Sequence, residues 1–245
     1  MKVTEKVIFI SNWIKDYVNK TPSKVESLVI GVSGGIDSSV SSTLSAMTGL
    51  KTIVLSMPIK QKLIQHNLSL KHQEWLIKNF KNVEAYTLSL DKLFETFENS
   101  LSKFDSEHGM ANSRARLRMT TLYQVAATNK GIVVGTGNKV EDFGVGFYTK
   151  YGDGGVDISP IADCNKTEVW EMGRELNILK EIIDASPTDG LWDDGRTDEG
   201  QLGLKYSELE EAMNNPNSLN REKYEKIRKL NLHKMEPIPV CKIPN

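Results

Sequence analysis

Cysteines are scarce in this chain: Cys164 and Cys241 are the only two in 245 residues, and they form no CxxC or metal-binding spacing. This scarcity excludes a disulfide framework and is typical of a reducing compartment. No hydrophobic run reaches the ~20 residues of a membrane span, and the N-terminus has no signal-like segment. The formal net charge is only −1, so the excess of Lys and Arg typical of nucleic-acid interfaces is missing. We therefore expect a cytoplasmic protein with no membrane and no nucleic-acid partner.

Short apolar runs alternate with amphipathic segments along most of the chain. Because the runs are short and rich in β-branched residues, strands are expected at 27–32, 52–57, 83–88 and 132–134. Apolar residues at helical spacing predict helices at 3–20, from residue 36, and at 66–80, 91–101 and 112–128.

The alternation of strands and helices predicts an α/β protein with a doubly wound parallel β-sheet flanked by helices. We expect one domain, residues 1–245. Residues 106–109 are expected to form a mobile loop, and Gly131 is expected to end the helix before it as a C-terminal glycine. Ligands of such sheets bind outside the carboxyl ends of the strands.

The most informative segment is SGGIDS, residues 33–38, between an apolar strand and a helix. A glycine pair lets the backbone approach an anion, and the amides that begin the next helix point toward it. The segment lacks both the lysine of a Walker loop and the GxGxxG spacing. Because a carboxylate among phosphates needs a cation between them, Asp37 is interpreted as a Mg²⁺ ligand, with Ser33, Ser38 and Ser39 donating to phosphate. The alternative is a Gly-Asp turn with an ordinary helix cap.

Three other segments should face the same crevice. The glycine-rich residues 135–157 favour a loop that wraps a ligand, with a solvated flexible loop as the alternative. In NSRARLRM, residues 112–119, Arg114 and Arg118 share a helix face while Arg116 projects elsewhere, so this is either an anion site or a solvated basic face. In residues 165–198, Lys166 begins a helix and a hydroxyl-bearing Ser-Pro-Thr turn follows, whereas Asp193 and Asp194 receive no role.

Taken in order, these motifs resemble the ammonia-dependent NAD synthetases, which are N-type ATP pyrophosphatases. The likeness covers nearly the whole chain, through SGGIDS, NSRARLRM, GTGNKVED, FYTKYGDGG, NKTEV, SPTDGL, DEGQLGLKY and LHKMEP. SGGIDS alone indicates only the superfamily, whereas FYTKYGDGG followed by a PT turn and a terminal HK pair is far more specific. The resemblance implies an adenine-nucleotide α-hydrolase-like, Rossmann-like fold. It also implies the last step of NAD biosynthesis, in which ATP adenylates deamido-NAD, pyrophosphate leaves, and ammonia then displaces AMP.

The resemblance implies a set of site residues. Its ATP contacts correspond to Gly31, Val32, Ser33, Gly34, Gly35, Ile36, Asp37, Ser38, Thr136, Lys166 and Thr188. Its contacts to deamido-NAD correspond to Arg116, Lys150, Asp157, His233 and Lys234. Asp37 and Glu141 are expected to hold Mg²⁺, and the catalytic residues are expected to be Asp37, Lys166 and Asp153. Ammonium is not nucleophilic until it loses a proton, so Asp153 is the expected acceptor of that proton, unless it only shapes its turn.

The chain departs from the family pattern after the fourth strand. Many relatives have GTDHAAE where this chain has GTGNKVE, so Glu141 stays in register but a histidine and an acid are missing. No stretch is long enough for an amidase domain, so free ammonia is the expected nitrogen donor, and a homodimer is expected from the family. Two alternatives stay open: another N-type ATP pyrophosphatase that acts on a different acceptor, and a non-catalytic ATP-binding module.

Overall fold

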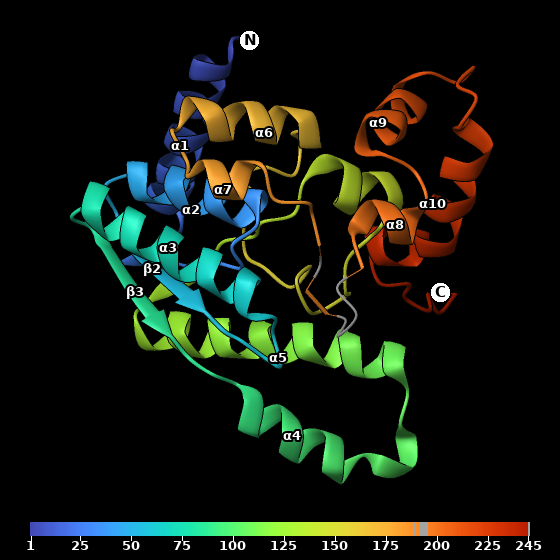
Figure 1. Cartoon of the computed structure of the whole chain (residues 1–245), viewed down its shortest axis with the longest axis horizontal. Coiled ribbons are helices and arrows are strands. Elements are labelled where there is room, and N and C mark those ends of the chain that lie inside the picture. The colour runs from blue at the N-terminus through green and yellow to red at the C-terminus, as the bar shows by residue number, and fades with distance from the viewer. Residues whose placement is uncertain (189, 192–195, 245) are drawn as a thin grey trace.

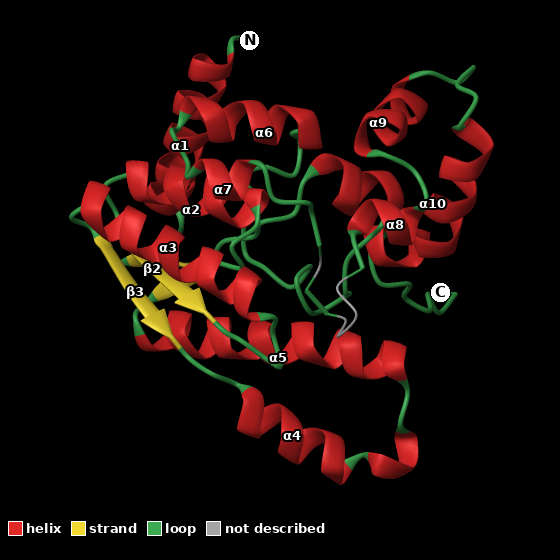
Figure 2. Cartoon of the chain, viewed as in Figure 1, coloured by secondary structure: helices red, strands yellow, loops and turns green. Residues whose placement is uncertain are grey.

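The structure, a computed structural model, describes residues 1–188, 190–191 and 196–244. Its frame is a parallel four-stranded sheet in the order β3-β2-β1-β4 (Figure 2). The strands are β1 (Ser27–Gly31), β2 (Lys51–Ser56), β3 (Val83–Thr87) and β4 (Gly131–Val133). The four predicted strands are confirmed, each with its ends shifted by no more than one residue.

Ten α-helices are assigned in the described residues. They are α1 (Val3–Lys20), α2 (Ile36–Met47), α3 (Leu63–Asn79), α4 (Asp91–Ser100), α5 (Glu107–Thr128), α6 (Lys166–Glu175), α7 (Lys180–Ile183), α8 (Asp198–Leu202), α9 (Tyr206–Asn214) and α10 (Arg221–Met235). A 3-10 turn, η1 (Ser102–Phe104), precedes α5, and a π-helix, η2 (Val140–Val145), follows β4. None of the helices described is long and apolar enough to cross a membrane.

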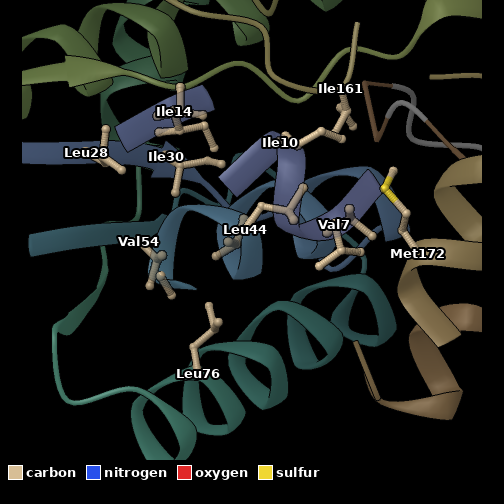
Figure 3. Close-up of a cluster of buried hydrophobic side chains, with 14 of the residues drawn as sticks. Val7, Ile10, Ile14, Leu28, Ile30, Leu44, Val54, Leu76, Ile161 and Met172 are labelled. Carbon is tan, nitrogen blue, oxygen red and sulfur yellow. The ribbon is translucent and has the colours of Figure 1, made fainter. Parts of the chain in front are cut away.

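Alternate residues of the strands enter two different cores, as the period of a strand requires. Leu28 and Ile30 belong to a core with α1, α2, α3 and α6, part of which Figure 3 shows. Val29, between them, enters a second core with α4 and α5, which lie on the opposite side of the sheet (Figure 1). Because helices cover both faces, the predicted doubly wound α/β fold is confirmed.

The structure corrects two predictions near α5. The expected loop at 106–109 is wrong, because α5 begins at Glu107 and the Ser106 hydroxyl caps it by accepting from the Gly109 amide. Gly131 does not end this helix, since α5 stops at Thr128 and Gly131 is the first residue of β4. A Cβ on Gly131 would lie 2.4 Å from Ser27 Oγ, so glycine here permits the close approach of β4 to β1.

The last three helices form a separate layer beside the sheet, which we call the C-terminal lobe (α8–α10, residues 198–235). Its core contains Leu202, Leu209 and Tyr224 together with Val140 and Val145 from the π-helix. Figure 1 shows β2 and β3 on the left, the lobe on the right and loops between them. The carboxyl edge of the sheet therefore faces the lobe across those loops.

Candidate active site

The main pocket lies at the carboxyl ends of β1 and β4, where the order of the strands reverses. Open α/β sheets bind ligands at such switch points. Its lining includes every residue predicted for ATP, namely Gly31, Val32, Ser33, Gly34, Gly35, Ile36, Asp37, Ser38, Thr136, Lys166 and Thr188. Glu141 and Asp153 line it as well. Segments separated by more than a hundred residues thus meet in one cavity.

The SGGIDS loop has the geometry of an anion cradle. Gly34 has φ +86°, and a Cβ there would lie 2.7 Å from the Ser69 amide nitrogen, so no other residue fits. Gly35 is the N-cap of α2, which directs the first amides of that helix toward the pocket. Ser39 is fully buried, donates to the Gly35 carbonyl oxygen at 2.9 Å, and does not line the pocket. Its hydroxyl therefore supports the loop rather than a ligand.

Three charged side chains meet at the centre of the pocket. Lys166 is only 1% exposed, and its Nζ lies 2.5 Å from Asp37 Oδ2 and 2.9 Å from Glu141 Oε1. Asn165 is the N-cap of α6, directly before Lys166, and its backbone amide donates to Glu168 Oε2 at 2.8 Å. The carboxylates of Asp37 and Glu141 thus converge on one cation position, which the side-chain ammonium group of Lys166 occupies.

The ionisation of these groups follows from their burial and mutual distances. Burial alone would lower the pKa of Lys166, but the charges of Asp37 and Glu141 raise it, so the amine stays protonated. Burial and the Glu141 charge raise the pKa of Asp37 in spite of Lys166. Burial works in the same direction on Glu141, yet Lys166 and the hydroxyl of Tyr206 hold the pKa of Glu141 below its usual value.

Two residues in this arrangement were not among the predicted ones. Asn138 is fully buried; its side-chain amide donates to Asp37 Oδ1 at 3.1 Å, and its Oδ1 accepts from the amides of Val140 and Glu141. Tyr206 donates to Glu141 Oε1 at 2.6 Å. An asparagine just before a helical segment is a capping signal that could have indicated Asn138. No local pattern indicates Tyr206, which comes from the C-terminal lobe.

Two further carboxylates line the pocket. Asp153 accepts a hydrogen bond from the Thr149 amide at 2.9 Å, and desolvation by the surrounding loop raises its pKa to about 6. Asp142, on the π-helix, has its pKa raised to about 8 by burial and by the charges of Glu141, Asp153 and Asp37. Asp153 was predicted as a site residue and Asp142 was not.

The five residues predicted for deamido-NAD do not line this pocket. Arg116 lies against the Lys150 carbonyl oxygen at 3.3 Å, and Lys150 Nζ donates to the His233 carbonyl oxygen at 2.7 Å. These three residues therefore form a connected group that joins α5, the glycine-rich stretch and α10. Lys234, next to them, donates to two backbone carbonyls of the glycine-rich stretch.

Asp157, Arg114 and Arg118 lie in three different surroundings. Asp157 accepts from the Val133 amide at 2.7 Å and so extends the end of β4. Arg118 lines the pocket, whereas Arg114 is buried and donates to the Leu191 carbonyl oxygen. In the SPTDGL motif, Ser186 and Thr188 line the pocket; Asp189, Asp193 and Asp194 are outside the described residues.

The donor set suits a hard divalent cation. Lys166 shows that Asp37 and Glu141 converge on a single positive charge. Among the described residues, no three His, Cys, Asp or Glu side chains are grouped so as to hold a metal by themselves. Mg²⁺ is often bound by one or two carboxylates with substrate phosphates and water as the other ligands. The residues present fit that mode of binding.

Comparison with known proteins agrees with this site. The family model described as NAD synthase matches residues 7–243. The NH(3)-dependent NAD(+) synthetase of Carboxydothermus hydrogenoformans is 36% identical over 212 residues, which cover 84% of this chain and 82% of that protein. The structure titled NMN synthetase from Francisella tularensis has a TM-score of 0.88 and 34% identity, and covers 100% of this chain and 99% of that one.

A more distant structure, the NH3-dependent NAD synthetase from Campylobacter jejuni, shares the fold with a TM-score of 0.78 and 23% identity; the match covers 99% of this chain and 100% of that one. The family model accounts for almost the whole sequence, including each segment that lines the pocket. On these grounds the chain belongs to the NAD synthase family.

Proposed function

We propose that this chain is an ammonia-dependent ligase that converts deamido-NAD to NAD and splits ATP into AMP and pyrophosphate. One observation carries the proposal: Asp37, Glu141 and Lys166 converge beside the SGGIDS amides in a single pocket. This arrangement provides an anion cradle, two carboxylates for a divalent ion and a buried cation. Membership of the NAD synthase family supplies the substrate class.

The first half of the reaction activates a carboxylate. The nicotinate carboxylate attacks the α-phosphorus of ATP, the bond to the β-phosphate oxygen breaks, and pyrophosphate leaves. The first amides of α2 and the ammonium group of Lys166 are placed to bind the negative charge of the leaving pyrophosphate. Bound Mg²⁺ would neutralise phosphate charge, and Asp37 and Glu141 are the residues that would hold it.

The second half forms the amide. Ammonia attacks the activated carbonyl carbon, and AMP leaves with the electron pair of the broken C–O bond. Because ammonium is the dominant form near neutral pH, a base must remove one proton before the attack. Asp153 is assigned this role, and its position in the pocket with a pKa raised to about 6 supports the assignment.

Residues 1–245 are proposed to act as one domain, since the C-terminal lobe contributes the hydroxyl group that binds Glu141. The homodimer and the cytoplasmic location stay predictions. So do the deamido-NAD contacts of Arg116, Lys150, Asp157, His233 and Lys234. A dimer would offer one explanation for contacts outside the pocket, because a partner subunit could bring its substrate to them.

A second candidate function is the amidation of the mononucleotide, which would give NMN. The Francisella tularensis structure titled NMN synthetase superposes on the whole chain. In addition, Arg116, Lys150 and Lys234 all donate to carbonyl groups of their own chain rather than face the pocket. Both observations favour a substrate without the second nucleotide.

One assay separates the candidates. The purified chain is incubated with ATP, Mg²⁺ and ammonium, together with either deamido-NAD or the nicotinate mononucleotide, and the amides are measured by chromatography. NAD formation with AMP and pyrophosphate supports the first candidate, and preferential NMN formation supports the second. Release of ADP and orthophosphate, or no product in either case, would refute both. Asp37→Ala serves as the inactive control. A ligase should lose its activity in this variant, whereas an ATP-binding module without turnover would form no product either as wild type or as Asp37→Ala.

A further inference from the structure

The first turn of α6 is capped by a residue from another part of the fold. The helix begins at Lys166, and the first amides of a helix have no partner within it. An N-cap side chain usually satisfies one of them, but the Asn165 side-chain oxygen is buried and accepts no hydrogen bond from the described residues. Instead, Glu210, on α9 of the C-terminal lobe, accepts from the Thr167 amide at 2.9 Å. The lobe therefore holds the turn that carries Lys166.

Both carboxylate oxygens of Glu210 bind Thr167. Oε1 accepts from the Thr167 amide at 2.9 Å, and Oε2 accepts from the Thr167 hydroxyl at 2.7 Å. Two bonds from one carboxylate fix the orientation of the bound residue as well as its distance. The positive end of the helix dipole favours a carboxylate at this position. Because Thr167 directly follows Lys166 in the chain, this contact determines where the Lys166 backbone lies.

A second contact joins α6 to the lobe one helical turn later. The rings of Trp170 and Tyr206 meet edge to face, with centroids 5.9 Å apart. Lys166 Nζ lies 4.7 Å from the centre of the Tyr206 ring. Tyr206 and Glu210 are four residues apart on α9, so they share a face of that helix. The two helices thus meet through an aromatic pair and a polar pair, and the polar pair lies next to Lys166 in the chain.

On the basis of the proposed amidation, we propose that Glu210 is a positioning residue that holds Lys166 between Asp37 and Glu141. Glu210 itself does not line the pocket. Lys166 Nζ makes contacts of 2.5 and 2.9 Å with the two carboxylates, so a small shift of the first turn of α6 would change both. A displaced ammonium group would bind the charge of the leaving pyrophosphate less well in the transition state, where a small error of position is costly.

Steady-state kinetics of the amidation test this role with Glu210→Ala, Glu210→Gln and Glu211→Ala. Glu211 is the matched control, because it is the next residue of α9 and accepts from Asn215 and Ser218 within the lobe. Glu210→Ala should lower kcat by about tenfold or more and change the KM values for ATP and the acid substrate by less than about twofold. Glu210→Gln should recover most of kcat, because its amide can accept from the Thr167 amide and donate to the Thr167 hydroxyl.

The control Glu211→Ala should keep at least about half of the wild-type kcat, since surface changes away from a site have small effects. A Glu210→Ala variant with the kcat of this control would overturn the inference. So would a Glu210→Gln variant as slow as Glu210→Ala, because the hydrogen bonds to Thr167 would then have no part in the effect.

A double-mutant cycle tests whether Glu210 acts through Thr167. Thr167→Val removes the hydroxyl but keeps the shape of the side chain and the backbone amide. It should lower kcat in the wild type and have little further effect in Glu210→Ala. Additive effects on kcat would overturn the inference, because Glu210 would then act through another residue. If Glu210→Ala does not fold, the same cycle is measured with Glu210→Gln, in which Thr167→Val should reduce kcat to no less than its value in Thr167→Val alone.

The position of Lys166 can also be followed without turnover, by acetylation with acetic anhydride and mass spectrometry. Acetylation of Lys166 should be slow in the wild type, because this residue is only 1% exposed. Relative to Lys51, whose side chain is 41% exposed, it should be at least about threefold faster in Glu210→Ala and unchanged in Glu211→Ala. An inactive wild type with this labelling pattern would refute the proposed function alone. An active wild type in which Glu210→Ala and Glu211→Ala are labelled alike would refute the inference alone.

Discussion

Replacing Lys166 by methionine should make the stability of this protein depend on a divalent ion. The methionine side chain is similar in length to lysine but carries no charge. The change therefore removes the cation between Asp37 and Glu141 while the side-chain volume stays nearly the same. The two carboxylates would then face each other in a site where Lys166 itself is only 1% exposed. Removing one partner of a buried ion pair costs about 3–5 kcal/mol, because the remaining charge is buried without compensation.

Protonation limits this cost and makes it depend on pH. Without Lys166, one of the two carboxyls should take up a proton, since burial and a like charge both raise its pKa above the value in the unfolded chain. The folded state then binds more protons than the unfolded state, so stability falls as the pH rises above the unfolded value of about 4. We expect the loss in Lys166→Met to be about 3 kcal/mol near pH 7 and smaller near pH 5.

The assay is chemical denaturation of the wild type, Lys166→Met and Lys139→Met, with and without Mg²⁺. Lys139 pairs with Asp163 at the surface, where the Asp163 side chain is 96% exposed, so its replacement should cost less than about 1 kcal/mol. Mg²⁺ should stabilise Lys166→Met more than the wild type, because the amine no longer occupies the cation position. A Lys166→Met variant as stable as the surface control, or one with no added response to Mg²⁺, would refute the reasoning.

Three further predictions test other parts of the structure. Tyr206→Phe removes the donor 2.6 Å from Glu141 and should cost about 1.5–3 kcal/mol while raising the Mg²⁺ concentration needed for half-maximal activity; an unchanged Mg²⁺ titration would contradict it. Gly34→Ala should abolish ATP binding measured by calorimetry, since the new Cβ would lie within 2.8 Å of three atoms. The control Gly49→Ala should retain ATP binding, because Gly49 also has a positive φ but a Cβ there would have no atom within 4 Å. Burial lowers the pKa of His72 to about 4, below the unfolded value of about 6.5, so the neutral form stabilises the fold above pH 6.5. Urea unfolding should lose about 3 kcal/mol between pH 6.5 and 4, and a His72→Gln variant with the same slope would contradict this assignment.

The strands and most helices could be predicted because their signals are local. The β-branched run of β1 and the helical spacing in α1 each lie within a few neighbouring residues, and both elements have nearly the expected bounds. The start of α5 was missed because its first turn is polar, and only the cap at Ser106 indicates it. Gly131 was misread because a glycine after a helix usually ends it, whereas here the reason for glycine is a contact with Ser27, distant in sequence.

The residues of the site divide in the same way. Asp37 and Glu141 lie in recognisable motifs, but their meeting at Lys166 depends on contacts between segments far apart in the chain. Tyr206 gives no local signal, since its role exists only once the C-terminal lobe has packed against the π-helix. Asp142 was not predicted as a pocket residue for a further reason. Its position depends on the π-helix and on the absence of a side chain at Gly137, and helical periodicity in the sequence indicates neither.

The C-terminal lobe and the sheet are joined through the metal ligands themselves. Glu141 is carried by the π-helix, whose Val140 and Val145 belong to the core of the lobe. Two residues before this π-helix, the Asn138 side chain donates to Asp37, which is carried by α2 on the sheet side. Any displacement of the lobe from the sheet would therefore alter the separation of the two carboxylates. A divalent ion and its phosphates need both carboxylates at a fixed spacing, so ligand binding and closure of the lobe should stabilise each other.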